Sequence, residues 1–159
     1  MKKPQKQQPK PLSPENYIKI KARLLPIHNC YISRDWKQQG MGFVIIVRIH
    51  RSGNLTFGTY LIDLFALCVK DTAWNFNQEF TVLNDILSRG DFEEIEYNLA
   101  HNIIFGSLEF AAEHGFKPHR DFEKYTKYIL EIDDNRIPLI DIEFGKDGKP
   151  LVIIGPFGR

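Results

Sequence analysis

The residues best suited to chemistry are His119 and Asp121, which form an HxD motif. An imidazole and a carboxylate at this spacing can reach one metal ion, and both ligand types suit zinc or manganese. The motif also lies at the start of a predicted helix, where His119 would stand near the cap and Asp121 would complement the helix dipole. We favour this structural interpretation, because two residues are not a metal site.

A second chemical feature is Asp63, which lies in a run that is otherwise apolar from Leu61 to Val69. A carboxylate in such surroundings must be hydrogen bonded, paired with a cation, or protonated. Lys70 and Asp71 adjoin the same run, and Lys70 can pair with Asp63 only if the fold brings them together. We favour a structural role for Asp63 as the cap of a short helix.

Together these residues define one enzymatic interpretation, a metal-dependent hydrolase similar to a phosphoesterase or a nuclease. Its site would combine Asp63, Lys70 or Asp71 with His119 and Asp121. One divalent cation held there would activate water. The sequence contains no GxxxxGK, GxGxxG, HExxH or GxSxG motif and no EF-hand loop. This absence is a modest argument against catalysis, and we predict a non-enzymatic protein without a cofactor.

Neither the cysteines nor His101 is expected to have a chemical role. Cys30 and Cys68 belong to no CxxC pair and are predicted to be small buried side chains. His101 falls on the polar face of a predicted amphipathic helix, so we expect it to be solvated.

The charge of the chain is divided unevenly. The sequence has 21 basic and 20 acidic residues, but four of the bases and none of the acids lie within the first 12 positions. This stretch mixes Lys, Gln and Pro with almost no apolar residue, so we predict that residues 1–12 form a flexible basic arm. Its lysines are Lys2, Lys3, Lys6 and Lys10.

Residues 13–159 are predicted to form a single domain. A chain of 159 residues has the usual size of one domain, and an aromatic fraction of 13% supplies large side chains for its core. The count of two cysteines excludes a disulfide-rich scaffold. No apolar run reaches the length of a signal peptide or the roughly 20 residues of a membrane span. We therefore expect a cytoplasmic protein without membrane association.

The clearest element is a β-hairpin with strands at residues 43–50 and 55–62 and a turn at Gly53. Because residues 44–47 are continuously apolar, the first strand should be covered on both faces and lie centrally in its sheet. Helical periodicity and capping residues indicate most of the other elements. Helices are predicted over residues 13–24, 63–69, 78–88, 91–115 and 119–130, and a short strand over residues 26–33.

The predicted order of elements ends with a second hairpin. Residues 139–144 alternate apolar and acidic side chains, residues 145–148 supply the turn, and residues 150–154 supply the return strand. Asp141 and Glu143 should therefore face water. The whole pattern predicts an α+β fold, with an antiparallel sheet formed by two hairpins and three to five helices packed mainly on one side.

Three blocks of the sequence resemble a family of bacterial domains of unknown function that carry similar blocks in the same order. The blocks are YLIDLFALCVKDT at 60–72, GFKPHRDF at 115–122 and EFGKDGKPLVIIGP at 143–156. Members of that family continue past the Gly-Pro pair with an acidic turn and another helix, whereas this sequence ends at Arg159. The resemblance implies a bacterial, cytosolic protein, and it implies no activity and no catalytic residues.

These observations leave three functional interpretations. The one we favour is a non-enzymatic binding or accessory domain of a bacterial cytoplasmic assembly, whose basic arm contacts RNA or DNA phosphates without base specificity. A solubilising tail is an equally simple interpretation of the arm. The second function is the metal-dependent hydrolase. The third is a protein-interaction module that joins an assembly by adding an edge strand of its terminal hairpin.

Overall fold

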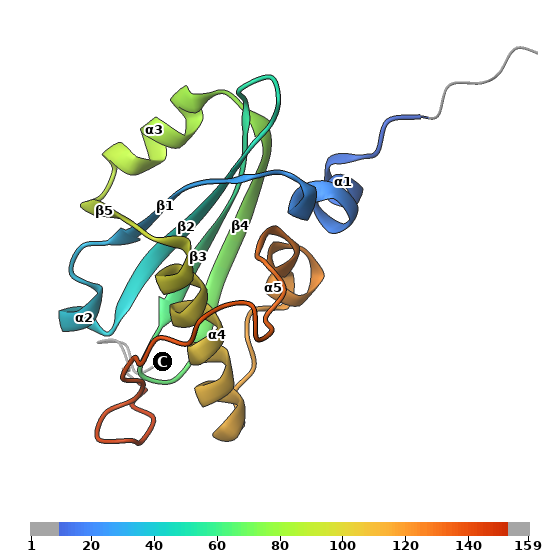
Figure 1. The fold of residues 1–159 in the computed structure, drawn as a ribbon. Coiled ribbons are helices and arrows are strands. Elements are labelled where there is room, and N and C mark those ends of the chain that lie inside the picture. Colours follow the sequence, from blue (N-terminus) through green and yellow to red (C-terminus); the bar gives the residue numbers. More distant parts are fainter. Residues whose placement is uncertain (1–9, 153–159) are drawn as a thin grey trace, which may run out of the picture.

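A computed structural model of the chain describes residues 10–152, and Figure 1 shows its fold. No helix among these residues is long and apolar enough to span a lipid bilayer. The elements are, in chain order, α1 (Pro14–Lys21), η1 (Ala22–Leu24), β1 (Ile27–Ser33), α2 (Trp36–Gln39), β2 (Met41–Ile49), β3 (Leu55–Asp63), β4 (Cys68–Gln78), α3 (Phe80–Ser88), β5 (Phe92–Ile95), α4 (Tyr97–Glu113), α5 (Arg120–Lys124) and η2 (Thr126–Ile129).

The centre of the fold is a five-stranded antiparallel sheet with the strand order β4-β3-β2-β1-β5. β2 is the middle strand. Its apolar run is buried on both sides, because Val44 and Ile46 face one hydrophobic layer while Ile45 and Val47 face the other. The prediction of a central strand covered on both faces is confirmed.

Helices cover the two faces of the sheet unequally (Figure 1). α1, α4, α5 and η2 pack on one face, where Tyr60, Ile103 and Phe122 belong to the larger hydrophobic layer. α3 packs on the other face and places Leu83 in a smaller layer with Phe57. The predicted α+β class is therefore confirmed, with an antiparallel sheet and helices mainly on one side.

Local signals at the first helix act as the sequence predicted. The Ser13 hydroxyl accepts a hydrogen bond from the N–H group of Asn16 at 3.3 Å, and Pro14 occupies the first helical position. The helix predicted over residues 119–130 is present as α5 and η2, which meet at Tyr125. α1 and η2 lie side by side on the sheet.

The predicted helix over residues 63–69 is wrong. Residues 64–67 form a turn, and the chain returns as the edge strand β4, so the second hairpin of the sheet is β3–β4. An edge strand is half solvated and needs no continuous apolar run. Lys70, Asp71 and Asn75 therefore hide the strand character of β4 in the sequence.

The start predicted for the longest helix is also wrong. Phe92–Ile95 form β5, which pairs with β1, and α4 begins only at Tyr97. The N–H group of Arg34 donates to the carbonyl oxygen of Asp91 at 2.8 Å, and the two side chains form an ion pair at 3.1 Å. Pairing with the free edge of β1 thus overrides the capping-box signal at Asp91 and Glu94.

The predicted terminal hairpin is only partly present. Residues 139–144 form no strand and lie against α4, while the turn at residues 145–148 closes through a bridge between Lys146 and Lys149. Residues 150–152 form no strand, and the rest of the expected return strand lies outside the described residues. The sheet has the strand order β4-β3-β2-β1-β5 and does not include this hairpin.

Candidate functional site

Asp63 has the structural role that we favoured. Its side chain is buried, and Oδ1 accepts hydrogen bonds from the N–H groups of Phe65 at 2.9 Å and Ala66 at 3.3 Å. These bonds satisfy a carboxylate that would otherwise be costly to bury. The bonds cap the turn between β3 and β4 rather than the helix that we expected.

Lys70 and Asp71 lie on the exposed surface of β4 and do not join Asp63. The register of β3 and β4 shifts here, with Ile62 opposite Val69 and Leu61 opposite Asp71, so Lys70 occupies a bulge. The Asp71 carboxylate accepts a hydrogen bond from the backbone N–H group of Thr72 at 2.9 Å. Lys70 forms no ion pair with Asp63 in the described structure.

His119 caps α5. Its side-chain Nδ1 accepts a hydrogen bond from the backbone N–H group of Asp121 at 3.1 Å. The backbone N–H group of His119 donates to the carbonyl oxygen of Val69 at 2.8 Å. The first bond satisfies a free donor of the helix, and the second ties the start of α5 to β4. Asp121 lies in the first turn, where its charge complements the helix dipole. The structural interpretation of the HxD motif is confirmed.

The candidate hydrolase residues thus have separate structural partners. Among residues 10–152, no three His, Cys, Asp or Glu side chains lie close enough to share a metal ion. Asp63 Oδ1 and His119 Nδ1 each accept a backbone hydrogen bond within their own segment of chain. Within the described part of the chain, the structure provides no site for the hydrolase interpretation.

Cys30 and Cys68 are buried and free, as predicted. Burial raises the pKa of each thiol to about 11. Because the thiolate is the reactive form, both residues are inert near neutral pH.

The prediction for His101 is wrong, because this side chain is buried rather than solvated. Its Nδ1 lies 2.8 Å from the hydroxyl of Tyr97, and its Nε2 lies 3.0 Å from the Asp133 carboxylate. The same tyrosine oxygen accepts the N–H group of Glu131 at 2.7 Å. The chain that follows η2 therefore covers this face of α4. Helical periodicity cannot predict such a contact, because it describes only the helix itself.

Asn102, the next residue of α4, holds the later part of the same chain. Its amide donates to the carbonyl oxygen of Pro138 at 2.9 Å, and its Oδ1 accepts the N–H group of Ile140 at 3.0 Å. The N–H group of Gly145 donates to the carbonyl oxygen of Leu64 at 2.8 Å. Residues 139–144, which we call the C-terminal segment, are thus fixed at both ends.

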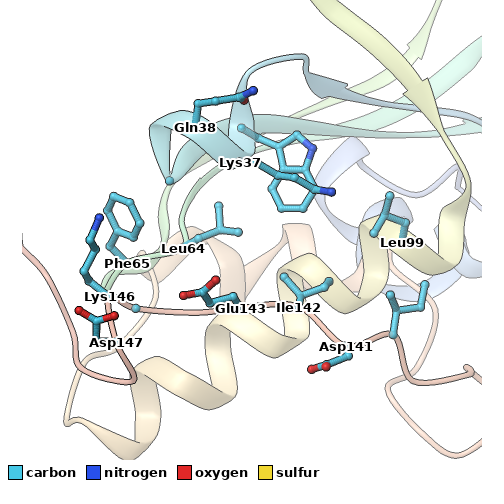
Figure 2. A pocket seen from close by; sticks show the side chains of 14 residues that line it. Lys37, Gln38, Leu64, Phe65, Leu99, Asp141, Ile142, Glu143, Lys146 and Asp147 are labelled. Carbon is cyan, nitrogen blue, oxygen red and sulfur yellow. The ribbon is translucent and has the colours of Figure 1, made fainter.

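A groove of about 630 Å³ opens between α2 and the C-terminal segment. Figure 2 shows Lys37 on the α2 side, Ile142 and Glu143 on the side of the segment, and Leu64 and Leu99 between them. This volume and the mixture of apolar walls with a few charged groups are typical of binding sites. The charged residues that line the groove are Lys37, Asp141, Glu143, Lys146 and Asp147.

Most main-chain groups of the C-terminal segment have no protein partner among the described residues. The N–H groups of residues 141–144 and the carbonyl oxygens of residues 139–144 form no hydrogen bond with another described residue. Exposure alternates along residues 141–144, as expected for an extended chain, with Asp141 and Glu143 exposed and Ile142 and Phe144 half-buried. The prediction that both acids face water is confirmed.

Sequence reasoning missed the groove because its walls come from four distant parts of the chain. α2 supplies Trp36 and Lys37, the β3–β4 turn supplies Leu64, and α4 supplies Leu99. The one available signal was the alternation of acidic and apolar side chains over residues 139–144. We assigned that signal to a strand paired within the terminal hairpin.

The predicted nucleic-acid contacts lie almost entirely outside the described residues. This applies to Lys2, Lys3 and Lys6, whereas Lys10 is described and exposed. Comparison with protein-family models, curated proteins and solved structures finds no match to this chain.

Proposed function

We propose that this protein is a non-enzymatic binding domain that takes up one extended strand of a protein partner. The partner strand lies in the groove between α2 and the C-terminal segment and pairs with the main chain of that segment. The proposal keeps the strand-addition mode of our third interpretation, but the segment acts as an unpaired strand rather than as part of a terminal hairpin.

The main-chain groups of the C-terminal segment carry the proposal. Among the described residues, the backbone donors and acceptors of positions 141–144 have no partner, and because this stretch is exposed or half-buried they are open to water or to a pairing strand. Six residues of extended chain are about 20 Å long, which is the length of a common β-strand. Strand addition would satisfy these groups on the groove side, because the α4 side is occupied by Asn102.

Charge on the segment favours a particular partner. Asp141 and Glu143 are two residues apart and therefore share one face of the extended chain. Opposite charges on paired strands attract, whereas like charges repel. The partner strand should place Lys or Arg at alternate positions, beside these carboxylates. Its intervening apolar side chains would contact Leu64 and Leu99 in the groove.

The test uses a labelled synthetic peptide of alternating valine and lysine as the probe, with binding followed by fluorescence anisotropy. The wild-type protein is expected to bind this peptide more tightly than a peptide of alternating valine and glutamate. N-methylation of alternate peptide bonds should abolish binding, because it removes the donors that pair with the segment.

A charge reversal in the protein provides the matched test. The double variant Asp141→Lys, Glu143→Lys should reverse the preference between the two peptides. Glu79→Lys serves as the control, since Glu79 is exposed next to α3 on the opposite side of the sheet. Equal binding of both peptides by the wild-type protein and by the double variant would refute the proposal.

A further inference from the structure

We propose that a second surface, formed by α1, α5 and η2, binds single-stranded nucleic acid through lysine–phosphate contacts and through bases stacked on tyrosine. This proposal does not depend on the groove, which lies elsewhere in the fold. It concerns residues of the folded domain, whereas the sequence indicated only the N-terminal arm.

Two neighbouring tyrosines are each flanked by two cations. The Nζ atoms of Lys19 and Lys124 both lie 5.2 Å from the ring centre of Tyr125. Tyr128 has Lys127 Nζ at 5.2 Å and the guanidinium carbon of Arg23 at 5.6 Å. Such pairs occur about once in 70–80 residues of an average protein, so four of them on two tyrosines is a local concentration.

The aromatic part of this surface continues onto the sheet. The ring of Trp74, on the edge strand β4, lies 5.9 Å from the ring of Tyr125 with an interplanar angle of 49°. Tyr125, Tyr128 and Trp74 are each partly exposed to solvent. We call Lys19, Lys124, Tyr125, Tyr128 and Trp74 the basic aromatic surface.

The charge of this surface is positive although the chain outside the arm is slightly acidic. Lys19 and Lys124 are exposed, and neither forms an ion pair with another described residue. Two carboxylates beside these elements are engaged elsewhere, because Glu123 binds Lys127 at 2.9 Å and Glu131 binds the buried Arg48 at 3.1 Å. Glu15 lies one turn before Lys19 on α1 and forms no ion pair with another described residue.

These groups match the two components of a single strand of nucleic acid. Lysines bind phosphates wherever they occur along the backbone, and aromatic rings stack with any base. Stacking requires unpaired bases, so a duplex offers only its phosphates to this surface. An acidic protein segment would use the lysines but would gain little from the tyrosine rings. The arrangement therefore favours single-stranded nucleic acid over both.

The surface also lies where the basic arm joins the domain. Lys10 is exposed and precedes α1, the helix that carries Lys19. Figure 1 shows that α1 is the first helix after the N-terminal chain. Lys10 is thus a further exposed cation on the chain that leads into α1.

The experiment measures binding of labelled oligouridylate of about 12 nucleotides, within the usual site size of such surfaces, to the full chain. Oligodeoxythymidylate of the same length distinguishes RNA from DNA, and the corresponding duplex tests the need for unpaired bases. Binding should be tighter to either single strand than to the duplex. Salt is varied between about 50 and 200 mM.

Two sets of variants separate charge from stacking. Lys19→Glu with Lys124→Glu should lower the slope of log affinity against log salt by about 1.4, because each lost phosphate contact removes about 0.7. Tyr125→Ala should weaken binding about tenfold with little change in slope, whereas Tyr125→Phe keeps the ring and should bind like the wild-type protein. The Phe variant also controls for folding.

The matched control is Lys37→Glu with Lys146→Glu, which makes the same charge change in the groove and should leave oligouridylate binding within twofold. An equal loss in this control would overturn the proposal, because binding would then follow net charge. It would also be overturned if Tyr125→Ala bound like the wild-type protein, or if polyglutamate displaced the oligonucleotide as well as unlabelled oligouridylate does. Absence of binding at about 50 mM salt would overturn it as well.

Discussion

The Nε atom of Arg48 donates a hydrogen bond to the carbonyl oxygen of Ile129 at 2.6 Å. This guanidinium is completely buried on the central strand β2, and its Nη1 donates to the carbonyl oxygen of Leu25 at 2.7 Å. It also donates to the carbonyl oxygen of Arg23 at 3.4 Å and to the Glu131 carboxylate at 3.1 Å. One buried side chain therefore holds the ends of η1 and η2 on the sheet and fixes the elements that carry the basic aromatic surface.

Replacement of Arg48 should strongly destabilise the fold. In Arg48→Ala, the carbonyl groups of Leu25 and Ile129 lose their donors in a buried site, and we expect a loss of about 3 kcal/mol in the free energy of unfolding. Arg48→Lys should recover only part of this loss, because an ammonium group cannot match the fork of a guanidinium. Urea unfolding followed by circular dichroism measures both values. A loss below about 0.5 kcal/mol in Arg48→Ala would contradict this role.

Asn102 is predicted to hold the C-terminal segment in the position needed for partner binding. Asn102→Ala leaves the N–H group of Ile140 and the carbonyl group of Pro138 without partners, so the segment should open about tenfold more often. Chymotrypsin cleavage after the exposed Leu139 reports this opening, and affinity for the valine–lysine peptide should fall in parallel.

The matched control for this prediction is Asn98→Ala, one turn earlier on α4. The Asn98 side chain forms no hydrogen bond with another described residue. The Asn102 side-chain amide donates to the backbone carbonyl oxygen of Asn98, which the substitution retains. Its substitution should leave both cleavage and peptide binding unchanged. Equal cleavage rates in Asn102→Ala and in the wild-type protein would show that the segment is held by other contacts.

Tyr97 should make the protein sensitive to alkali. Burial raises the pKa of its hydroxyl above the ordinary value of 10.0. Above pH 10 the unfolded chain can therefore release a proton that the folded protein retains, and stability falls as pH rises. One such group contributes up to about 1.4 kcal/mol per pH unit to the slope.

Comparison of the wild-type protein with Tyr97→Phe isolates this contribution. The variant should be less stable at neutral pH, because the bonds to Glu131 and His101 are lost. Its stability should nevertheless fall less steeply between about pH 10 and 11, where the unfolded tyrosine ionises. Tyr60, whose pKa is raised chiefly by burial and also by Tyr97, is present in both proteins. Parallel stability curves would refute the assignment.

The parts of the fold that sequence predicted correctly depend on local or continuous signals. Residues 44–47 are apolar at every position, and only a strand covered on both faces buries all of them. Ser13 is predictable as a helix cap because its side chain acts within three residues of its own position. Asp63 also acts locally, but it caps a turn and not the predicted helix. Such features are determined by nearby chain and need no knowledge of the topology.

The errors arise where distant partners decide the outcome. Residues 91–96 contain good helix-capping residues, but Phe92–Ile95 complete the edge of β1 instead. His101 occupies the face of α4 that is polar by periodicity, yet Asp133 and Tyr97 enclose it. The groove was unpredictable for the same reason, because its residues become neighbours only after the sheet and α4 have packed.

The final prediction separates the arm from the folded surface. Substitution of all four arm lysines by glutamine should lower the salt slope of oligouridylate binding by about 0.7 for each lysine that contacts a phosphate, up to about 2.8. Affinity at high salt should then depend mainly on Tyr125, so adding Tyr125→Ala to this variant should cause a further loss of about tenfold. An unchanged slope would show that the arm only solubilises the protein, while a retained effect of Tyr125→Ala would still assign base stacking to the domain. The substituted residues are Lys2, Lys3, Lys6 and Lys10.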